Sequence, residues 1–283
     1  MNGFEQFMLW LDSRMTTPTS YGWYHLLCWG IMIVACALIY IFRKKISPKA
    51  VNITIIVSGV VLLIFELLKQ LSFSFHVDGA GNAVWNFNFS NFPFQFCSTP
   101  MYLLLIVGFF KKGQIRESIL SYLGTFAFFA GLIVMIIPND VFISQIFINI
   151  HTMIWHGGMV IIGFLLLATR TVRLNFKSVY KATIVFVIML IIALLMNIIA
   201  HHVNPESDVN MFYIGPYIAC HLPLLSLIYP AVPWIIFFIM YTAGFFAVAC
   251  IIMGIAIGFD KLERRKEPVE VTDKIIKIIK SDL

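Results

Sequence analysis

The sequence predicts an all-α polytopic membrane protein with seven transmembrane helices, and three observations lead to that prediction. Hydrophobic residues make up 60% of the 283 residues and charged residues only 12%, whereas soluble globular proteins average about 45–50% and about 25%. The mean hydropathy is +0.90. Several stretches are long and apolar enough to cross a hydrocarbon core roughly 30 Å thick, and the basic residues fall in alternate connections between them.

Each predicted span is an apolar run bounded by polar or charged residues. The seven spans cover residues 23–42, 51–73, 92–110, 119–137, 146–168, 182–200 and 232–259. A further apolar stretch follows the sixth span, but Pro216, Pro223 and Pro230 interrupt it. We therefore expect a re-entrant or interfacial segment near 211–231 on the outer face, where protein or water satisfies the broken backbone. An eighth crossing is the alternative.

The basic residues predict the orientation of these spans. Eighteen of the twenty Lys and Arg residues lie in 43–49, 111–116, 170–181 and 261–280. The other connections, which are 74–91, 138–145 and 201–231, contain none. The positive-inside rule then places the N-terminus outside and the C-terminus in the cytoplasm, with Arg14 and Lys69 as the exceptions. The net charge of +6 thus follows from topology, and no nucleic-acid partner is expected.

This pattern divides the chain into three parts. Residues 1–22 form an extracellular N-terminal segment, residues 23–259 a seven-helix membrane domain, and residues 260–283 a basic cytoplasmic tail. In residues 268–283, pairs of isoleucine alternate with lysine in a spacing that favours a short helix on an anionic inner leaflet. A solvated tail is the alternative interpretation.

Polar residues inside the predicted spans are costly and mark the best candidates for a functional site. Counting about 1.5 Å per helical residue from the nearest cytoplasmic basic residue places Cys97 and His156 about 21 Å above the inner boundary. The same count puts Glu66 and Asn197 near that level. A second tier lies slightly further out and contains Lys69, His151 and His201. Two polar tiers predict a cavity that opens toward the outer leaflet.

Each of these residues also has a structural interpretation. Glu66 and Lys69 are i,i+3 neighbours and can neutralise one another inside the bundle. Asn197 can serve as an interhelical hydrogen-bonding residue. Cys97 can be a small buried apolar side chain, as free cysteines usually are, although Gln95 and its other neighbours are unusually polar for the start of a span.

Cys97 and two histidines form a candidate nucleophile and base. A thiol attacks as the thiolate after a base takes its proton. His151 and His156 lie five residues apart, about 140° around a helix, so at most one of them faces Cys97 directly. Depth favours His156 as the base and leaves His151 to orient it or to line the cavity. Gly157 and Gly158 would let another backbone or an acyl chain approach closely.

Four segments of the chain carry a resemblance to a known family. They are FPFQFCSTPMYL (92–103), IHTMIWHGGM (150–159), NMFYIG (210–215) and PAVPW (230–234). Over roughly residues 20–260 the chain resembles the bacterial YwaF-like integral membrane proteins, which are related to the animal transmembrane protein 164 (TMEM164) family.

The resemblance implies a set of site residues and an activity. The family pattern has a proline, a polar residue and a cysteine, followed by two histidines five residues apart. The matching positions are Pro93, Gln95, Cys97, His151 and His156. Animal members are described as phospholipid acyltransferases that use the cysteine as acyl carrier, which implies Cys97 as nucleophile and His156 or His151 as base. Membrane phospholipids or lysophospholipids would be the partners, and the bacterial plasma membrane the location.

The resulting hypothesis is a ping-pong acyl transfer in the outer half of the bilayer, with Gln95 or Asn197 as donor to the oxyanion. Water as acceptor would make the protein a lipase. No cofactor and no metal are expected. Two other classes stay open: a transporter or small-molecule receptor that uses Glu66, Lys69 and the histidines as a relay, and a metal or haem site that includes His201.

Overall fold

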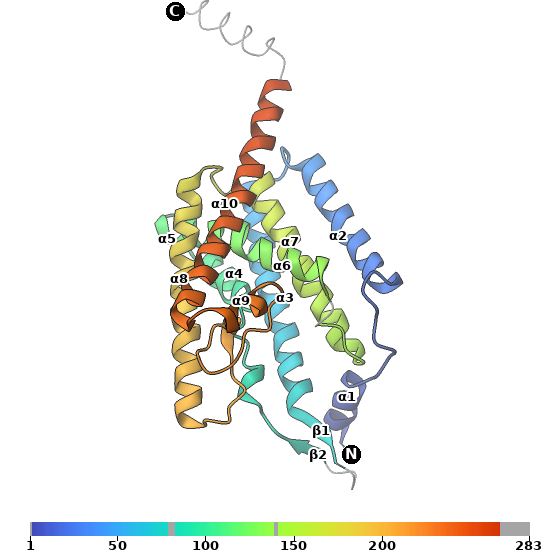
Figure 1. The fold of residues 1–283 in the computed structure, drawn as a ribbon. Coiled ribbons are helices and arrows are strands. Elements are labelled where there is room, and N and C mark those ends of the chain that lie inside the picture. Colours follow the sequence, from blue (N-terminus) through green and yellow to red (C-terminus); the bar gives the residue numbers. More distant parts are fainter. Residues whose placement is uncertain (1, 79–82, 139–140, 267–283) are drawn as a thin grey trace, which may run out of the picture.

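The computed structural model describes residues 2–78, 83–138 and 141–266, in which the chain forms a bundle of long helices (Figure 1). Within these residues, six helical runs are long and apolar enough to cross a membrane. They are α2 (Trp23–Phe42), α3 (Pro48–Ser74), the continuous run Gln114–Ile136, α7 (Ile146–Ala168), α8 (Phe176–Val203) and α10 (Trp234–Lys266). The protein is therefore a predominantly helical, multi-pass membrane protein.

The remaining elements are short and lie at the ends of the bundle or between its helices. They are α1 (Gly3–Leu11), β1 (Phe75–Val77), β2 (Ala83–Trp85), η1 (Phe89–Asn91), α4 (Thr99–Phe109), η3 (Met211–Tyr213), α9 (Leu225–Ile228) and η4 (Tyr229–Ala231). β1 and β2 pair as an antiparallel hairpin, which the all-α prediction did not include. The hairpin continues directly from the end of α3 (Figure 1).

Most predicted spans agree closely with helices, and the third is the exception. Residues 23–42 and 146–168 match α2 and α7 at both ends. In the third predicted span, residues 92–110, only α4 is helical, and its 11 residues cover about 16 Å, or half of a hydrocarbon core. Pro100 begins this helix in its first turn, where the missing N–H of proline costs nothing. The preceding residues form turns.

The helical run 114–136 is not uniform. It consists of α5 (Gln114–Tyr122), a π-helical turn η2 (Leu123–Ala127) and α6 (Phe128–Ile136). All five residues of η2 are buried. At the junction, the hydroxyl of Tyr122 hydrogen-bonds Thr99 at the start of α4 over 2.9 Å. Such π-helical turns are often found near functional sites.

Glycines let neighbouring helices approach closely at two contacts. A Cβ atom on Gly108 of α4 would lie 2.5 Å from a side-chain carbon of Ile56 of α3. A Cβ on Gly131 of α6 would lie 2.6 Å from the carbonyl oxygen of His156 of α7. Small residues at helix interfaces are the usual means of close packing in membrane bundles. They hold α4 and α6 against the helices that carry the predicted polar residues.

The segment between α8 and α10 contains no helix long enough to cross a membrane. Between Val203 and Trp234 the longest helix is α9, with four residues. Figure 1 shows the chain returning from the lower end of α8 into the bundle, so that α10 begins near mid-height and runs past the upper end. The prediction of a re-entrant segment near 211–231 fits this path better than an eighth span.

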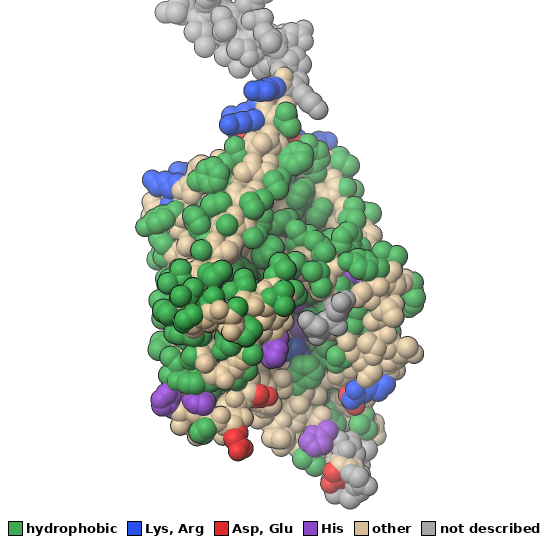
Figure 2. Space-filling view, in the orientation of Figure 1, with side chains coloured by type: hydrophobic (Ala, Val, Ile, Leu, Met, Phe, Trp, Pro, Cys, Tyr) green, Lys and Arg blue, Asp and Glu red, His purple; other side chains and the backbone are tan. Residues whose placement is uncertain are grey.

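Charged side chains differ between the two ends of the bundle. Figure 2 shows Lys and Arg gathered toward the upper end, and Asp and Glu mainly near the lower end. The two basic exceptions are both paired with acids: Arg14 lies 2.7 Å from Asp12, and Lys69 lies 2.8 Å from Glu66. The predicted helix in the tail falls on residues 267–283, outside the described part of the chain.

Candidate functional site

Cys97 lies in the turn that leads into α4, and α7 fixes its backbone. The amide N–H groups of Ser98 and Thr99 donate to the carbonyl of Gln95 over 2.8 and 3.2 Å and close the turn. The indole Nε1–H of Trp155 on α7 donates to the carbonyl of Cys97 over 2.7 Å. The backbone of Cys97 is therefore held against the helix turn that also carries His156, the residue after Trp155.

His156 is oriented by its own helix. Its Nδ1 lies 2.8 Å from the carbonyl oxygen of Thr152. Since a carbonyl only accepts, Nδ1 carries the proton and Nε2 has a free lone pair in the neutral ring. The side chain is 6% exposed, and Nε2 has no hydrogen-bond partner among the described residues. This is a buried imidazole with an available basic nitrogen.

His151 belongs to a second polar group, which also contains a carboxylate and an ammonium. Glu66 of α3 is 2% exposed and accepts a hydrogen bond from Gln70 over 2.6 Å, in addition to the ion pair with Lys69. The other carboxylate oxygen of Glu66 lies 3.7 Å from Nε2 of His151, beyond hydrogen-bond distance. His151 also stacks on Trp155, with ring centroids 5.0 Å apart. Trp155 thus contacts both Cys97 and His151.

These two groups lie close enough to act on one another. The ammonium of Lys69 is within electrostatic range of Cys97, His151 and His156. Lys69 and His151, which were expected slightly further out than Glu66, both approach its carboxylate, Lys69 at 2.8 Å and His151 at 3.7 Å. Among the described residues, no hydrogen bond joins the thiol of Cys97 to either histidine. Figure 2 shows the face in view hollowed near mid-height, with histidine and basic side chains visible in the hollow.

Gln95 and Asn197 hydrogen-bond to backbone groups of the segment between α8 and α10, which agrees with the structural interpretation given for Asn197. Gln95 donates from Nε2 to the carbonyl of Asn210 over 3.0 Å and accepts from the N–H of Phe212 over 2.8 Å. Asn197 on α8 donates to the carbonyl of Met211 over 3.0 Å and accepts from the same residue's N–H over 2.6 Å. Because both amides pair with backbone in this way, they position the re-entrant segment.

The segment 210–215 is held in a strained conformation at the bundle core. Phe212 and Tyr213 have φ angles of 58° and 56°, which are unusual for residues other than glycine. Tyr241 and Trp234 of α10 donate to the carbonyls of Phe212 and Ile214 over 3.0 and 2.9 Å. Phe212 is fully buried and packs beside Phe96, with ring centroids 5.5 Å apart. The segment therefore packs against the Cys97 turn through Phe212 and Phe96.

His201 does not join the polar cluster. It lies near the end of α8, where its ring stacks on Tyr217 at a centroid distance of 3.7 Å. Counting residues from the cytoplasmic anchor gives the depth of His201 in the membrane. It does not give the direction in which the side chain faces, and the side chain of His201 faces Tyr217. Cys97 and Cys220 are both free thiols. In the described residues, no three or more His, Cys, Asp or Glu side chains are grouped to hold a metal.

Trp155 and Asn210 are the site residues that the sequence did not single out. Asn210 accepts from the N–H of Gly215 over 2.8 Å and donates to the carbonyls of Ile218 and Ala219, and so organises the re-entrant segment. Trp155 hydrogen-bonds a backbone group that is distant in sequence, and Asn210 hydrogen-bonds backbone groups within its own loop. Their only sequence signal was their presence in the IHTMIWHGGM and NMFYIG segments.

Fold and site together define a multi-pass membrane protein with a buried polar cluster between α3, α7 and the Cys97 turn. The chain belongs to the TMEM164 family, whose family model matches residues 16–255. That range covers every residue of the cluster. Comparison with curated proteins found no match, and comparison with solved structures found none.

Proposed function

We propose that the protein is a membrane-embedded lipid acyltransferase that carries the acyl group as a thioester on Cys97, with His156 as the base. The observation that supports this most strongly is the arrangement around Trp155. Its indole holds the carbonyl of Cys97, and the next residue presents a buried, unpaired Nε2. Membership of the TMEM164 family is compatible with this activity, which is proposed here on the site itself.

In the first half-reaction, Nε2 of His156 takes the proton of the Cys97 thiol. The thiolate attacks an ester carbonyl of a phospholipid and forms a carbon–sulfur bond. When the tetrahedral intermediate collapses, the ester carbon–oxygen bond breaks, and the leaving lysophospholipid oxygen takes the proton from His156. The thiol must first move within hydrogen-bond distance of Nε2, a tightening that catalytic groups often undergo when substrate binds.

In the second half-reaction, a hydroxyl of a lysolipid acceptor gives its proton to His156 and attacks the thioester. The new ester forms, the carbon–sulfur bond breaks, and the Cys97 sulfur recovers the proton. Water in place of the lysolipid would release a free fatty acid and make the reaction a hydrolysis. Only the acceptor differs between these outcomes.

Lys69 and Glu66 would support this chemistry from α3. The ammonium of Lys69 would favour negative charge on the Cys97 sulfur and on the oxyanion, against the burial of the thiol and the nearby Glu66 carboxylate, which both oppose it. Glu66 compensates that ammonium in the resting state and orients His151. We assign His151 to positioning, since its Nε2 faces Glu66.

We further propose seven crossings, with the site in the outer half of the bilayer. The short α4 and the turns before it would complete the third crossing, and the protein around them satisfies the irregular backbone. The end of the bundle that carries the basic connections would face the cytoplasm. The membrane would be the cell membrane, in keeping with the location expected from the sequence.

A vesicle assay tests the proposed activity. Purified protein is reconstituted with a phospholipid labelled in its acyl chain and an unlabelled lysophospholipid, and labelled product is quantified. We expect Cys97→Ala to reduce transfer to background and His156→Gln to slow it by about 10²–10⁴-fold. Cys250→Ala removes a thiol from α10 and should have no effect. Full activity of a folded Cys97→Ala variant would rule out the proposal.

A transporter or receptor is the second candidate, and the Glu66, Lys69 and His151 group favours it. These side chains form a buried ionisable cluster that makes no hydrogen bond to Cys97, as expected for a proton or substrate relay. Proton flux into vesicles that survives Cys97→Ser and disappears in Glu66→Gln would support this candidate over the acyltransferase.

A further inference from the structure

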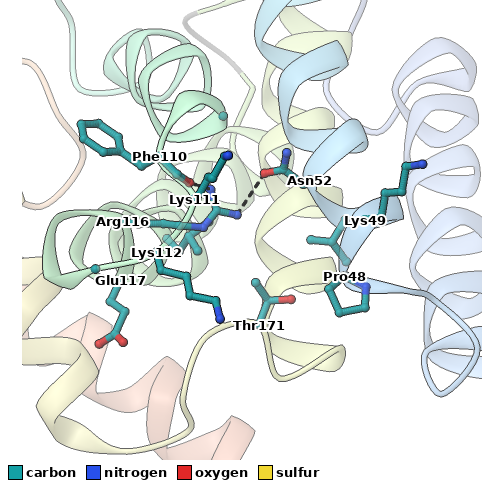
Figure 3. A pocket seen from close by; sticks show the side chains of 13 residues that line it. Pro48, Lys49, Asn52, Phe110, Lys111, Lys112, Arg116, Glu117 and Thr171 are labelled. Carbon is teal, nitrogen blue, oxygen red and sulfur yellow. Dashed lines mark hydrogen bonds between the residues drawn. The ribbon is translucent and has the colours of Figure 1, made fainter.

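A polar cavity lies at the opposite end of the bundle from the re-entrant segment. It has a volume of about 560 Å³ and opens between the start of α3, the connection from α4 to α5 and the connection from α7 to α8. Its polar lining consists mainly of Lys49, Lys111, Lys112, Arg116, Asn52 and Thr171. Figure 3 shows Lys111, Lys112 and Arg116 on one side of the opening, with Lys49 on the other.

The cavity carries an excess of positive charge. Lys49, Lys111 and Lys112 form no ion pair with any described residue. The acidic residue in the lining, Glu117, is paired with Lys181 and lies 3.7 Å from Arg173. The cavity therefore has uncompensated cations without a protein partner in the described part of the chain.

Arg116 gives the cavity a fixed cationic wall. Its Nη1 donates to the carbonyls of Val107 and Phe110, over 2.6 and 2.8 Å, at the end of α4. Its Nη2 donates to Asn52 of α3 over 3.0 Å, the contact drawn as a dashed line in Figure 3. A guanidinium held by three neutral oxygens keeps its full charge and a defined position.

The surroundings of the cavity are apolar and exposed, as a lipid site requires. Phe109, at the end of α4 beside Phe110, is 85% exposed, and Ile115, beside Arg116, is 61% exposed. Side chains of this kind stay in contact with acyl chains in a bilayer, while lysines at the same level reach the head-group region. A soluble phosphate compound would use the cations and leave the apolar side chains without a role.

We propose that this cavity binds the phosphate head group of an anionic phospholipid, with its acyl chains running along Phe109 and Ile115. Lys111, Lys112 and Lys49 neutralise the head group, and Arg116 sets the depth of the phosphate. Basic pockets between helices on the cytoplasmic side are a recurrent solution for anionic lipid recognition. This site is separate from Cys97 and His156 and does not depend on the activity proposed for them.

Native mass spectrometry of the delipidated, full-length protein tests the proposal with phosphatidylglycerol as probe. We expect it to bind with higher affinity than phosphatidylcholine. The double variant Lys111→Gln/Lys112→Gln should weaken binding about tenfold or more. The matched variant Lys44→Gln/Lys45→Gln removes two positive charges from the neighbouring basic connection, outside the cavity lining, and should change the affinity by less than about twofold.

Three outcomes would overturn the assignment. Equal loss in both double variants would indicate general attraction to a basic surface. Equal binding of phosphatidylcholine and phosphatidylglycerol would show that the cavity does not recognise anionic charge. Displacement of the lipid by equimolar inorganic phosphate would make it a site for soluble phosphate. Cys97→Ser should bind the lipid as the wild type does, so failure of the acyltransferase proposal leaves this test unaffected.

Discussion

Trp155 connects the parts of the candidate site. Its indole N–H donates to the carbonyl of Cys97, its ring stacks on His151, and its backbone neighbour is His156. The side chain is 2% exposed, so water does not compete for the indole hydrogen bond. The position of the Cys97 backbone relative to both histidines therefore depends in part on this side chain.

Trp155→Phe tests that dependence. Phenylalanine keeps an aromatic ring to stack on His151 but leaves the carbonyl of Cys97 without its donor. A buried polar group left unpaired costs about 1–3 kcal/mol, and we expect it to be relieved by movement of the Cys97 turn. Acyl transfer in the vesicle assay should fall at least tenfold, mainly in kcat. Trp29→Phe serves as control, because Trp29 bonds the carbonyl of Met135 elsewhere in the bundle; an equal loss there would contradict the specific role.

Single residues were predictable where their chemistry was unusual for a membrane span. Cys97, Glu66 and the two histidines stood out as polar groups in apolar runs, and the structure brings them near one another. His201 stood out for the same reason but faces Tyr217 instead. Trp155 gave no such signal, since a tryptophan in an apolar helix is ordinary and its partner is a backbone group 58 residues away in sequence.

At the scale of elements, the contact between α6 and α7 fixes the helix that carries both histidines. Gly131 of α6 sits against the carbonyl of His156 and the side chain of Met159. A side chain at position 131 would meet the backbone carbonyl of His156, and a backbone group cannot rotate away as a side chain can. Gly158 on α7 has no atom within 4 Å of the position a Cβ would take, so it offers a matched control.

We predict opposite effects for alanine at these two glycines. Gly131→Ala should lower the stability by about 1–3 kcal/mol, because the helices must move apart to admit the methyl group. It should also lower the activity, since the displaced segment is the turn of His156. Gly158→Ala should leave both unchanged or raise the stability slightly, as alanine favours helix. Thermal unfolding in detergent and the vesicle assay measure the two effects; equal stability of the two variants would show that the contact is less tight than described.

The elements were predictable to the extent that composition alone determines them. Long uniform apolar runs such as 23–42 and 146–168 match α2 and α7 at both ends, because a bilayer leaves a hydrophobic run few alternatives to a helix. The helix of the third span was predicted too long, since residues 92–98 mix apolar and polar side chains and form turns before α4 begins. The hairpin β1–β2 was missed because two three-residue strands carry almost no periodic signal.

At the scale of the whole molecule, the number of crossings decides on which side each terminus lies. Six long helices are present in the described residues, and α4 with the turns before it is the candidate for the seventh crossing. The described parts of the basic connections all lie toward one end of the bundle (Figure 2), and this holds for six crossings as for seven. Charge distribution therefore predicts orientation, but the passage of residues 92–110 through the membrane needs a separate test.

Reporter tags on the two termini give that test. Seven crossings place the tags on opposite sides of the membrane, with the N-terminal tag outside, and six crossings place them on the same side. We expect an impermeant protease added to intact cells to remove the N-terminal tag and to spare the C-terminal one until the cells are permeabilised. Protection or removal of both tags together would contradict the seven-span arrangement and the outer location of the site.

The central claim is that Cys97 carries an acyl group, and intact-protein mass spectrometry tests it most directly. Protein purified with native lipids is compared with Cys97→Ser, before and after brief hydroxylamine treatment, which cleaves thioesters. The account predicts a fatty-acyl mass on the wild type that hydroxylamine removes and that the variant lacks. A wild-type protein that stays unmodified and also fails to react with lipid activity probes would contradict it, and the polar cluster would then be a binding or transport site.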